Sequence, residues 1–256
     1  MHRISRLVSS IPGFLFVASV PLFLIAGSVI YAVNDAGLYN RGFQRYNVSS
    51  MTGITYSDLA QAGADLRHYF NSPSEPLSVH TRIYGLERNL FNQREVTHMA
   101  DVKRLFWSVY AVGGITGAYL IILTLGGLVW RRQQYNVRLA RYYLKGGILT
   151  LVLVLAVGLF SAIGFDALFL KFHQISFRND LWMLNPHTDY LLLMFPQGFW
   201  LYSTLWVTGV TIIGAMMTVT MSGSYLLWRR QSRKHGIGCQ ASTMTNMCRS
   251  RDRFNN

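Results

Sequence analysis

Two of the seven histidines in this 256-residue chain, His98 and His173, stand beside carboxylates or amides next to long apolar runs. Around the first of them, Glu95, His98 and Asp101 recur every third residue. On a helix these three residues share one face, with about 5 to 6 Å between neighbouring Cβ atoms. A histidine beside a carboxylate is typical of general base catalysis, because the carboxylate fixes the imidazole tautomer and stabilises the imidazolium. Glu95 or Asp101 is therefore a candidate for orienting His98.

The same residue types allow two other interpretations. Both histidines together with one of the two carboxylates could bind a metal ion. Alternatively, the carboxylates pair with Arg94 or Lys103 on a solvated helix face. The sequence has no glycine-rich phosphate loop, no cysteine pair at zinc spacing, and no HExxH or GxSxG motif. Because Cys239 and Cys248 both lie in the C-terminal tail, the body of the protein also has no cysteine nucleophile.

Composition restricts the elements that can position these side chains. The chain is 51% hydrophobic with a mean hydropathy of +0.23, yet its pI is near 10.1, which excludes most soluble classes. Long uncharged runs occur at Leu7–Asn34, Leu105–Trp130, Gly146–Phe165 and Tyr190–Trp228. Since about 20 helical residues cross a hydrocarbon core of about 30 Å, each run predicts one helix, over Ser203–Leu227 in the last run. The sequence therefore predicts an all-α integral membrane protein with four transmembrane helices.

The distribution of charge predicts the orientation of these helices. The N-terminus, segment 131–145 and the chain after Trp228 together hold 14 basic residues and one acidic residue. Segments 35–104 and 166–202 together hold 10 basic and 10 acidic residues. By the positive-inside rule, both termini and segment 131–145 are cytoplasmic, and the other two segments are outer loops. The net charge of +13 therefore indicates topology and requires no nucleic-acid partner.

Residues 1–234 are predicted to form a single membrane domain, and residues 235–256 a disordered cytoplasmic tail rich in polar residues. The first apolar run is 28 residues long, whereas the apolar core of a signal peptide has about 7 to 15 residues. We therefore expect the first run to be a retained transmembrane helix.

Short amphipathic helices are expected in both outer loops. One covers residues 57–70 with Ser57 as its N-cap. Another begins at Asn89 and continues into the second transmembrane helix. In the second loop, the apolar segment Tyr190–Trp200 is interrupted by Pro196, and we expect it to lie half buried among lipid headgroups.

Two motifs, in this order, carry a resemblance to a known family. The first is REVTHMADVK at Arg94–Lys103, followed by a transmembrane run. The second is FHQISF at Phe172–Phe177, followed by Asn179-Asp180, Trp182, Asp189 and Phe195-Pro196. Together they resemble the lipoprotein intramolecular transacylase (Lit) family of bacterial four-span membrane proteins, over residues 7–228.

The resemblance implies an acyltransferase that acts on bacterial lipoproteins. Such an enzyme moves the sn-2 acyl chain of an S-diacylglyceryl-cysteine, at the N-terminus of the lipoprotein, onto the amino group of the same cysteine. Because transfer of an acyl group from an ester to an amide runs downhill, we expect no cofactor, and we assign no metal. The resemblance implies the bacterial cell membrane, and the charge distribution predicts that both termini are cytoplasmic and the active site extracytoplasmic. The implied partners are diacylglyceryl-modified lipoproteins and membrane lipids.

Roles for individual residues follow from the resemblance. His98 and His173 would be the base and the acid, in either order, and Asp101 or Glu95 the orienting carboxylate. Substrate positioning or oxyanion stabilisation would fall to Asn179, Asp180 and Trp182, whose alternative roles are a turn or helix cap and an interfacial anchor. The competing class is a non-enzymatic membrane sensor or assembly scaffold, in which the two histidines would be packed apart or exposed.

Overall fold

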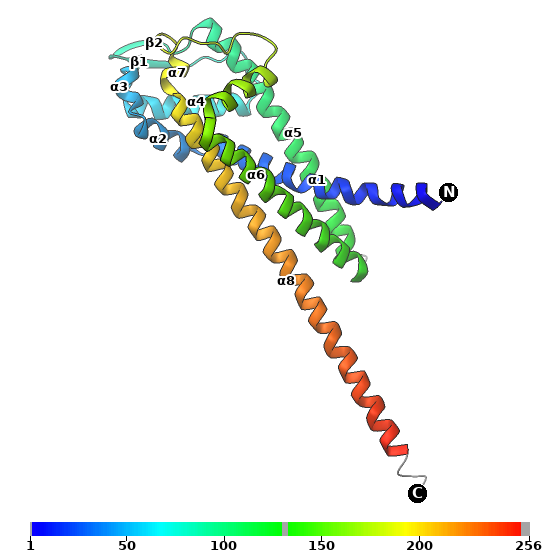
Figure 1. The fold of residues 1–256 in the computed structure, drawn as a ribbon. Coiled ribbons are helices and arrows are strands. Elements are labelled where there is room, and N and C mark those ends of the chain that lie inside the picture. The colour runs from blue at the N-terminus through cyan, green and yellow to red at the C-terminus, as the bar shows by residue number, and fades with distance from the viewer. Residues whose placement is uncertain (1, 130–132, 252–256) are drawn as a thin grey trace.

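A computed structural model describes residues 2–129 and 133–251. Its four long helices are α1 (His2–Asn34), α5 (Gln93–Val129), α6 (Gln133–Ser176) and α8 (Gln197–Arg251). The short elements are α2 (Ala36–Arg45), α3 (Val48–Thr52), α4 (Tyr56–Asn71), β1 (His80–Ile83), β2 (Leu86–Asn89) and α7 (Tyr190–Met194). Figure 1 shows that the short elements gather at one end of the long helices.

Each long helix contains one of the predicted transmembrane runs. By length and composition, four segments are long and apolar enough to cross a membrane: Pro12–Asn34, Gln93–Gly127, Gln134–Ser176 and Gln197–Ser232. The prediction of an all-α membrane protein with four transmembrane helices is therefore confirmed.

The long helices pack closely where α6 carries two consecutive glycines. α6 contacts α8 most extensively, and α1 contacts α5, α6 and α8. A Cβ atom at Gly146 would lie 2.6 Å from Cβ of Val20, and one at Gly147 would lie 2.8 Å from Cγ2 of Val219. Within a membrane, helix association depends on such close packing, because lipid tails are as apolar as the helix surfaces. The two glycines thus allow α6 to contact α1 and α8 at the same level.

The short elements and the first turns of α5 share one hydrophobic core, and we call this unit the outer domain. Its most completely buried side chains come from α2, the segments between elements, α4 and α7: Phe43, Ile54, Leu59, Leu66, Leu90 and Met194. The outer domain therefore folds around a core of its own at the ends of the four long helices.

The amphipathic helix predicted in the first outer loop is α4, whose buried residues recur every three or four positions. Its N-cap is Thr55, whose Oγ1 accepts a hydrogen bond from the N–H of Asp58 at 3.2 Å. The prediction of Ser57 as N-cap is wrong, because Ser57 already lies inside the helix. The helices α2 and α3 were not predicted.

A β-hairpin, also not predicted, joins α4 to α5. β1 and β2 pair antiparallel through a two-residue turn at Tyr84 and Gly85, where φ is 50° and 80°. Such turns usually carry Asn, Asp or Gly at both positions, so a tyrosine at the first one hides the hairpin from sequence reasoning. The Tyr84 N–H donates to the carbonyl of Gly53 at 2.8 Å, which holds the turn against the end of α3.

α5 begins later than predicted because Asn92 and Glu95 form a capping box. The Asn92 Oδ1 accepts from the N–H groups of Arg94 and Glu95 at 2.9 and 3.1 Å, and the Glu95 Oε2 accepts from the Asn92 N–H at 2.7 Å. The other oxygen, Oε1, accepts from the N–H of Leu191 at 2.7 Å. One buried carboxylate therefore joins the start of α5 to α7.

The prediction that Tyr190–Trp200 lies among lipid headgroups is wrong. Leu191, Met194, Phe195 and Phe199 from this segment are all buried in the core of the outer domain. Protein atoms cover this apolar surface, and the Glu95 carboxylate satisfies the first backbone N–H of the buried stretch.

The helix α8 has its last residue at Arg251. The division into a membrane domain at residues 1–234 and a disordered tail at residues 235–256 stays a prediction. The sequence contains no proline from Gln197 to Arg251 that would end the helix. Residues 252–256 of the predicted tail and residues 130–132 of the predicted inner segment lie outside the described residues.

Replacing Glu95 with alanine is expected to destabilise the outer domain. The N–H groups of Asn92 and Leu191 would lose their acceptor, and the Leu191 group, which is buried, would cost about 1–3 kcal/mol when unsatisfied. The measurement is thermal unfolding of the purified protein in detergent. Glu87→Ala, on the exposed strand β2, is the control and should change the free energy of unfolding by less than about 0.5 kcal/mol. Equal melting temperatures for the two variants would contradict this role of Glu95.

Candidate active site

The structure brings together the two histidines that the sequence singled out. His98 lies in the second turn of α5, and His173 lies in the last turn of α6. Their ring centroids are 6.3 Å apart, and both rings pack against Phe177, at 5.1 and 5.6 Å. His98 is buried and His173 is half-buried. A scaffold with histidines packed apart or fully exposed does not match this arrangement.

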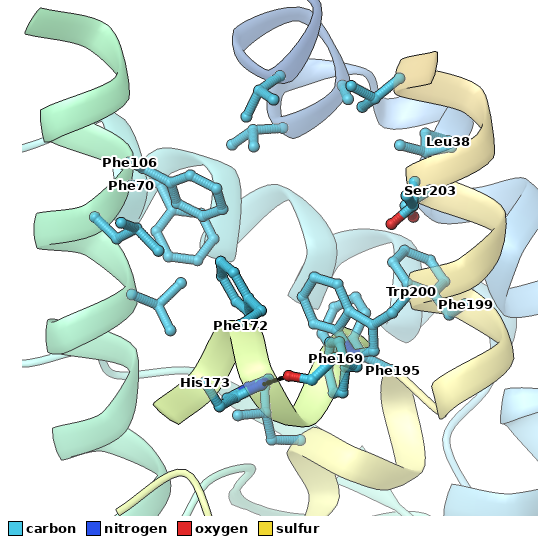
Figure 2. Close-up of a pocket in the computed structure, with 18 of the residues that line it drawn as sticks. Leu38, Phe70, Phe106, Phe169, Phe172, His173, Phe195, Phe199, Trp200 and Ser203 are labelled. Carbon is cyan, nitrogen blue, oxygen red and sulfur yellow. Dashed lines mark hydrogen bonds between the residues drawn. The ribbon is translucent and has the colours of Figure 1, made fainter. Parts of the chain in front are cut away.

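A hydrogen bond defines the tautomer of His173. Its Nδ1 lies 2.8 Å from the carbonyl oxygen of Phe169, as Figure 2 shows. A carbonyl oxygen only accepts, so Nδ1 carries the proton, and the Nε2 of the neutral ring has a free lone pair. The ring also lies 5.1 Å from that of Trp182 and 5.2 Å from that of Phe172. Apolar rings therefore surround an imidazole whose Nε2 is the atom able to accept a proton.

Neither predicted carboxylate holds Nδ1 of His98, a buried atom for which the structure gives no hydrogen-bond partner. Both carboxylate oxygens of Glu95 accept from backbone N–H groups. Asp101 accepts from the Asn179 amide at 2.9 Å and forms an ion pair with Arg104. The spacing correctly places the three residues on one helix, but both acidic side chains extend to other partners. The predicted orienting role is thus not provided by a hydrogen bond to Nδ1.

Asp101, together with Arg94 and Asn92, instead helps to fix the segment 177–189, which we call the covering loop. Asn179 anchors it to Asp101, and the Arg94 guanidinium donates to the Asp180 carbonyl at 2.5 Å. Further along, the Asn92 amide donates to Asp189 at 3.0 Å.

Of the three residues predicted to position substrate, Trp182 is the one whose ring packs against a histidine, His173. The amide nitrogen of Asn179 donates to Asp101, and its Oδ1 accepts from the Leu181 N–H at 3.1 Å. Asp180 takes part through its main-chain carbonyl, which accepts from Arg94.

The histidine pair borders an apolar cavity of about 470 Å³. Its wall combines side chains from α1, α2, α4, α5, α6, α7 and α8 with Phe177. In Figure 2, Phe70 and Phe106 lie on one side and Phe169 and Trp200 on the other, with Ser203 away from His173. Sequence reasoning missed these lining residues, because apolar side chains in transmembrane helices carry no signal that distinguishes a cavity wall from a lipid-facing surface.

Three polar side chains of the wall were also missed: Tyr39, Ser203 and Thr204. Ser203 Oγ is buried and has no hydrogen-bond partner among the described residues. Tyr39 is buried, and burial raises the pKa of its phenol, an effect that the nearby Arg67 only partly opposes. Tyr39 therefore remains a neutral phenol at neutral pH.

Among the side chains that the structure describes, no three of His, Cys, Asp or Glu lie close enough together to hold a metal ion. A second cavity of about 490 Å³ lies between α5, α6 and α8 near the opposite end of the long helices. Its lining contains no histidine and no carboxylate, so the first cavity is the one of the two that histidines line.

Comparisons with known proteins identify the family and the fold of the chain. The model of the family described as lipoprotein intramolecular transacylase Lit matches residues 14–200. A crystal structure of the membrane-integral Lit from Bacillus cereus superposes with a TM-score of 0.73 at 21% identity, covering 91% of this chain and all of that chain. A variant of the same protein with a histidine replaced by arginine gives a TM-score of 0.70 at 20% identity, covering 90% and 97% of the two chains.

One curated relative has no described activity. It is an uncharacterized protein of Aquifex aeolicus (strain VF5), 25% identical over 136 residues, or 52% of this chain. The match spans 56% of that relative's length. The family model covers well over half of the chain and includes both histidine motifs. The chain therefore belongs to the lipoprotein intramolecular transacylase (Lit) family.

Proposed function

We propose that this protein moves the sn-2 acyl chain of an S-diacylglyceryl-cysteine onto the α-amino group of the same cysteine, at the N-terminus of a bacterial lipoprotein. The product carries one acyl chain on nitrogen and one on glycerol. The observation that carries the proposal is the His98–His173 pair at an apolar cavity bounded by transmembrane helices. Such a site joins acid–base groups to a surface suited to lipid.

The absence of a cysteine nucleophile near the cavity agrees with a reaction inside one substrate. The substrate supplies both the attacking amine and the ester, so binding it converts the transfer into an intramolecular step. The enzyme then needs to orient the two groups and move protons. Two histidines are sufficient for the second task at neutral pH.

The proton transfers follow from the tautomer of His173. The α-amino group, whose pKa is ordinarily about 7.7 to 8.0, loses a proton to a ring nitrogen as it attacks the ester carbonyl. We assign this base role to Nε2 of His173, because Nδ1 already donates to Phe169. The tetrahedral intermediate then releases the glycerol oxygen, which takes up a proton as the carbon–oxygen bond breaks. We assign to His98 either the donation of that proton, which the protonated His173 then restores, or the stabilisation of the oxyanion by its N–H. The Trp182 indole is a second candidate donor to the oxyanion.

The proposed location of the site is the extracytoplasmic surface of the bacterial cell membrane, with both termini in the cytoplasm. The histidines lie in the outer turns of α5 and α6, beside the outer domain. The excess of basic residues lies at the other ends of the helices, which supports this orientation by the positive-inside rule.

The function is tested by mass spectrometry of lipoprotein N-terminal peptides from cells with and without this protein, in a host lacking other N-acylating enzymes. The expected peptide has unchanged total mass, with one acyl chain on nitrogen and one on glycerol. A gain of one acyl mass would indicate an external donor and overturn the proposal. No change, with the protein present in the membrane, would favour a sensor or scaffold.

Replacing either His98 or His173 with alanine is expected to lower kcat by at least about 100-fold, since each proton transfer contributes about 10² to 10⁴. His68→Ala is the matched control, because His68 is exposed on α4 and does not line the cavity. The measurement is turnover of a synthetic diacylglyceryl lipopeptide by purified protein. Activity near the wild-type level in both single variants would remove the assignment.

The anchoring of the covering loop gives a separate prediction. Asp101→Ala and Asn179→Ala should each lower kcat/KM, because each breaks the same link between α5 and the loop that carries Trp182. The double variant should be no worse than the more affected single variant, since coupled residues are not additive. Additive losses in the double-mutant cycle would show that the two residues act independently.

A further inference from the structure

The cavity beside the histidines extends into the transmembrane helices. On α8 its lining residues recur every three or four positions from Phe199 through Ser203 to Val207, so they form one face of the helix. These eight helical steps cover about 12 Å along the helix axis. Half of a hydrocarbon core of about 30 Å is about 15 Å, so the lined face covers most of the depth of one leaflet.

Two valines mark the inner end of this lining. Val157 is the innermost lining residue on α6, and Val207 is the innermost on α8. At the same level the two helices approach closely, since a Cβ atom at Gly158 would lie 3.4 Å from Cγ2 of Thr208. One turn beyond Val207, Thr211 is only 1% exposed. The helices therefore close together immediately below the two valines.

The geometry points to a limit on acyl-chain length: we propose that the cavity holds the migrating acyl chain and that Val157 and Val207 set the longest chain it accepts. The inference rests on the function proposed above. The carbonyl carbon of the migrating chain must reach His173, and its methylene groups need an apolar path away from the polar glycerol. This cavity supplies that path, because its wall is almost entirely apolar and the chain exchanges the apolar bilayer for an equally apolar surrounding. A chain that reaches the valines fills the lined depth, and a longer chain meets the packed helices.

The test measures kcat/KM for synthetic lipopeptides that differ only in the length of the sn-2 chain. Val207→Phe, which shortens the cavity, should lower kcat/KM at least tenfold for the longest chains that the wild type accepts and leave the shortest nearly unchanged. Val207→Ala, which deepens the cavity, should shift the accepted range toward longer chains. Leu205→Phe is the matched control, because Leu205 lies on the same helix, is 46% exposed and does not line the cavity.

Each outcome has a distinct meaning. A length-dependent loss in Val207→Phe, with Leu205→Phe like wild type, supports the inference. If Val207→Phe fails to accumulate, Val207→Ala carries the test through its gain of longer substrates. An unchanged length profile in Val207→Ala and in any folded Val207→Phe overturns the chain-length limit while the transacylase function stands. No turnover of any lipopeptide by the wild type overturns the proposed function and this inference together.

Discussion

The buried carboxylate of Glu95 is the interaction on which the arrangement of the site depends. It accepts from two backbone N–H groups, one at the start of α5 and one at the start of α7. His98 follows on α5 one turn later, and α7 leads through Phe195 into α8, which forms the opposite wall of the cavity. His98 and the α8 wall of the cavity therefore take their relative position from one carboxyl group that is 1% exposed. A polar group buried so completely requires hydrogen-bond partners, and the two N–H groups supply them.

A second set of polar links holds the covering loop over the histidine pair. Asp101, Arg94 and Asn92 on or next to the first turns of α5 bond three points of the loop. Trp182 from this loop and Phe177 at its start pack against the histidine rings. The polar residues of the two sequence motifs thus organise one another, while the imidazoles remain surrounded by apolar rings. This separation suits a reaction in which protons move at the edge of a lipid-binding cavity.

The sequence was sufficient to predict the four transmembrane helices, the amphipathic α4 and the two histidines of interest. Long uncharged runs and three-residue spacing are properties of a single helix, so they do not depend on how the helices pack. The roles of Glu95 and Asp101 could not be predicted in this way. Spacing identifies neighbouring Cβ atoms, but a long side chain ends where a distant backbone or amide group happens to lie, here at Leu191 and Asn179.

Other features escaped prediction for related reasons. The β-hairpin turns through Tyr84 with positive φ, which a tyrosine rarely adopts. The segment after Asp189 was predicted to lie at a lipid surface because its sequence is apolar. The sequence does not show which protein residues cover it in the fold. Residues from seven helices line the cavity, and the sequence of one helix does not indicate which face of it packs against the others.

In the proposed reaction, one substrate molecule both donates and receives the acyl chain. A crossover experiment with purified protein in lipid nanodiscs tests this property. One diacylglyceryl lipopeptide carries deuterated acyl chains on an unlabelled peptide, and a second carries ordinary acyl chains on a ¹⁵N-labelled peptide. We predict that every N-acylated product keeps the pairing of chain and peptide in its own substrate. Products that combine a deuterated N-acyl chain with a ¹⁵N-labelled peptide would contradict the account.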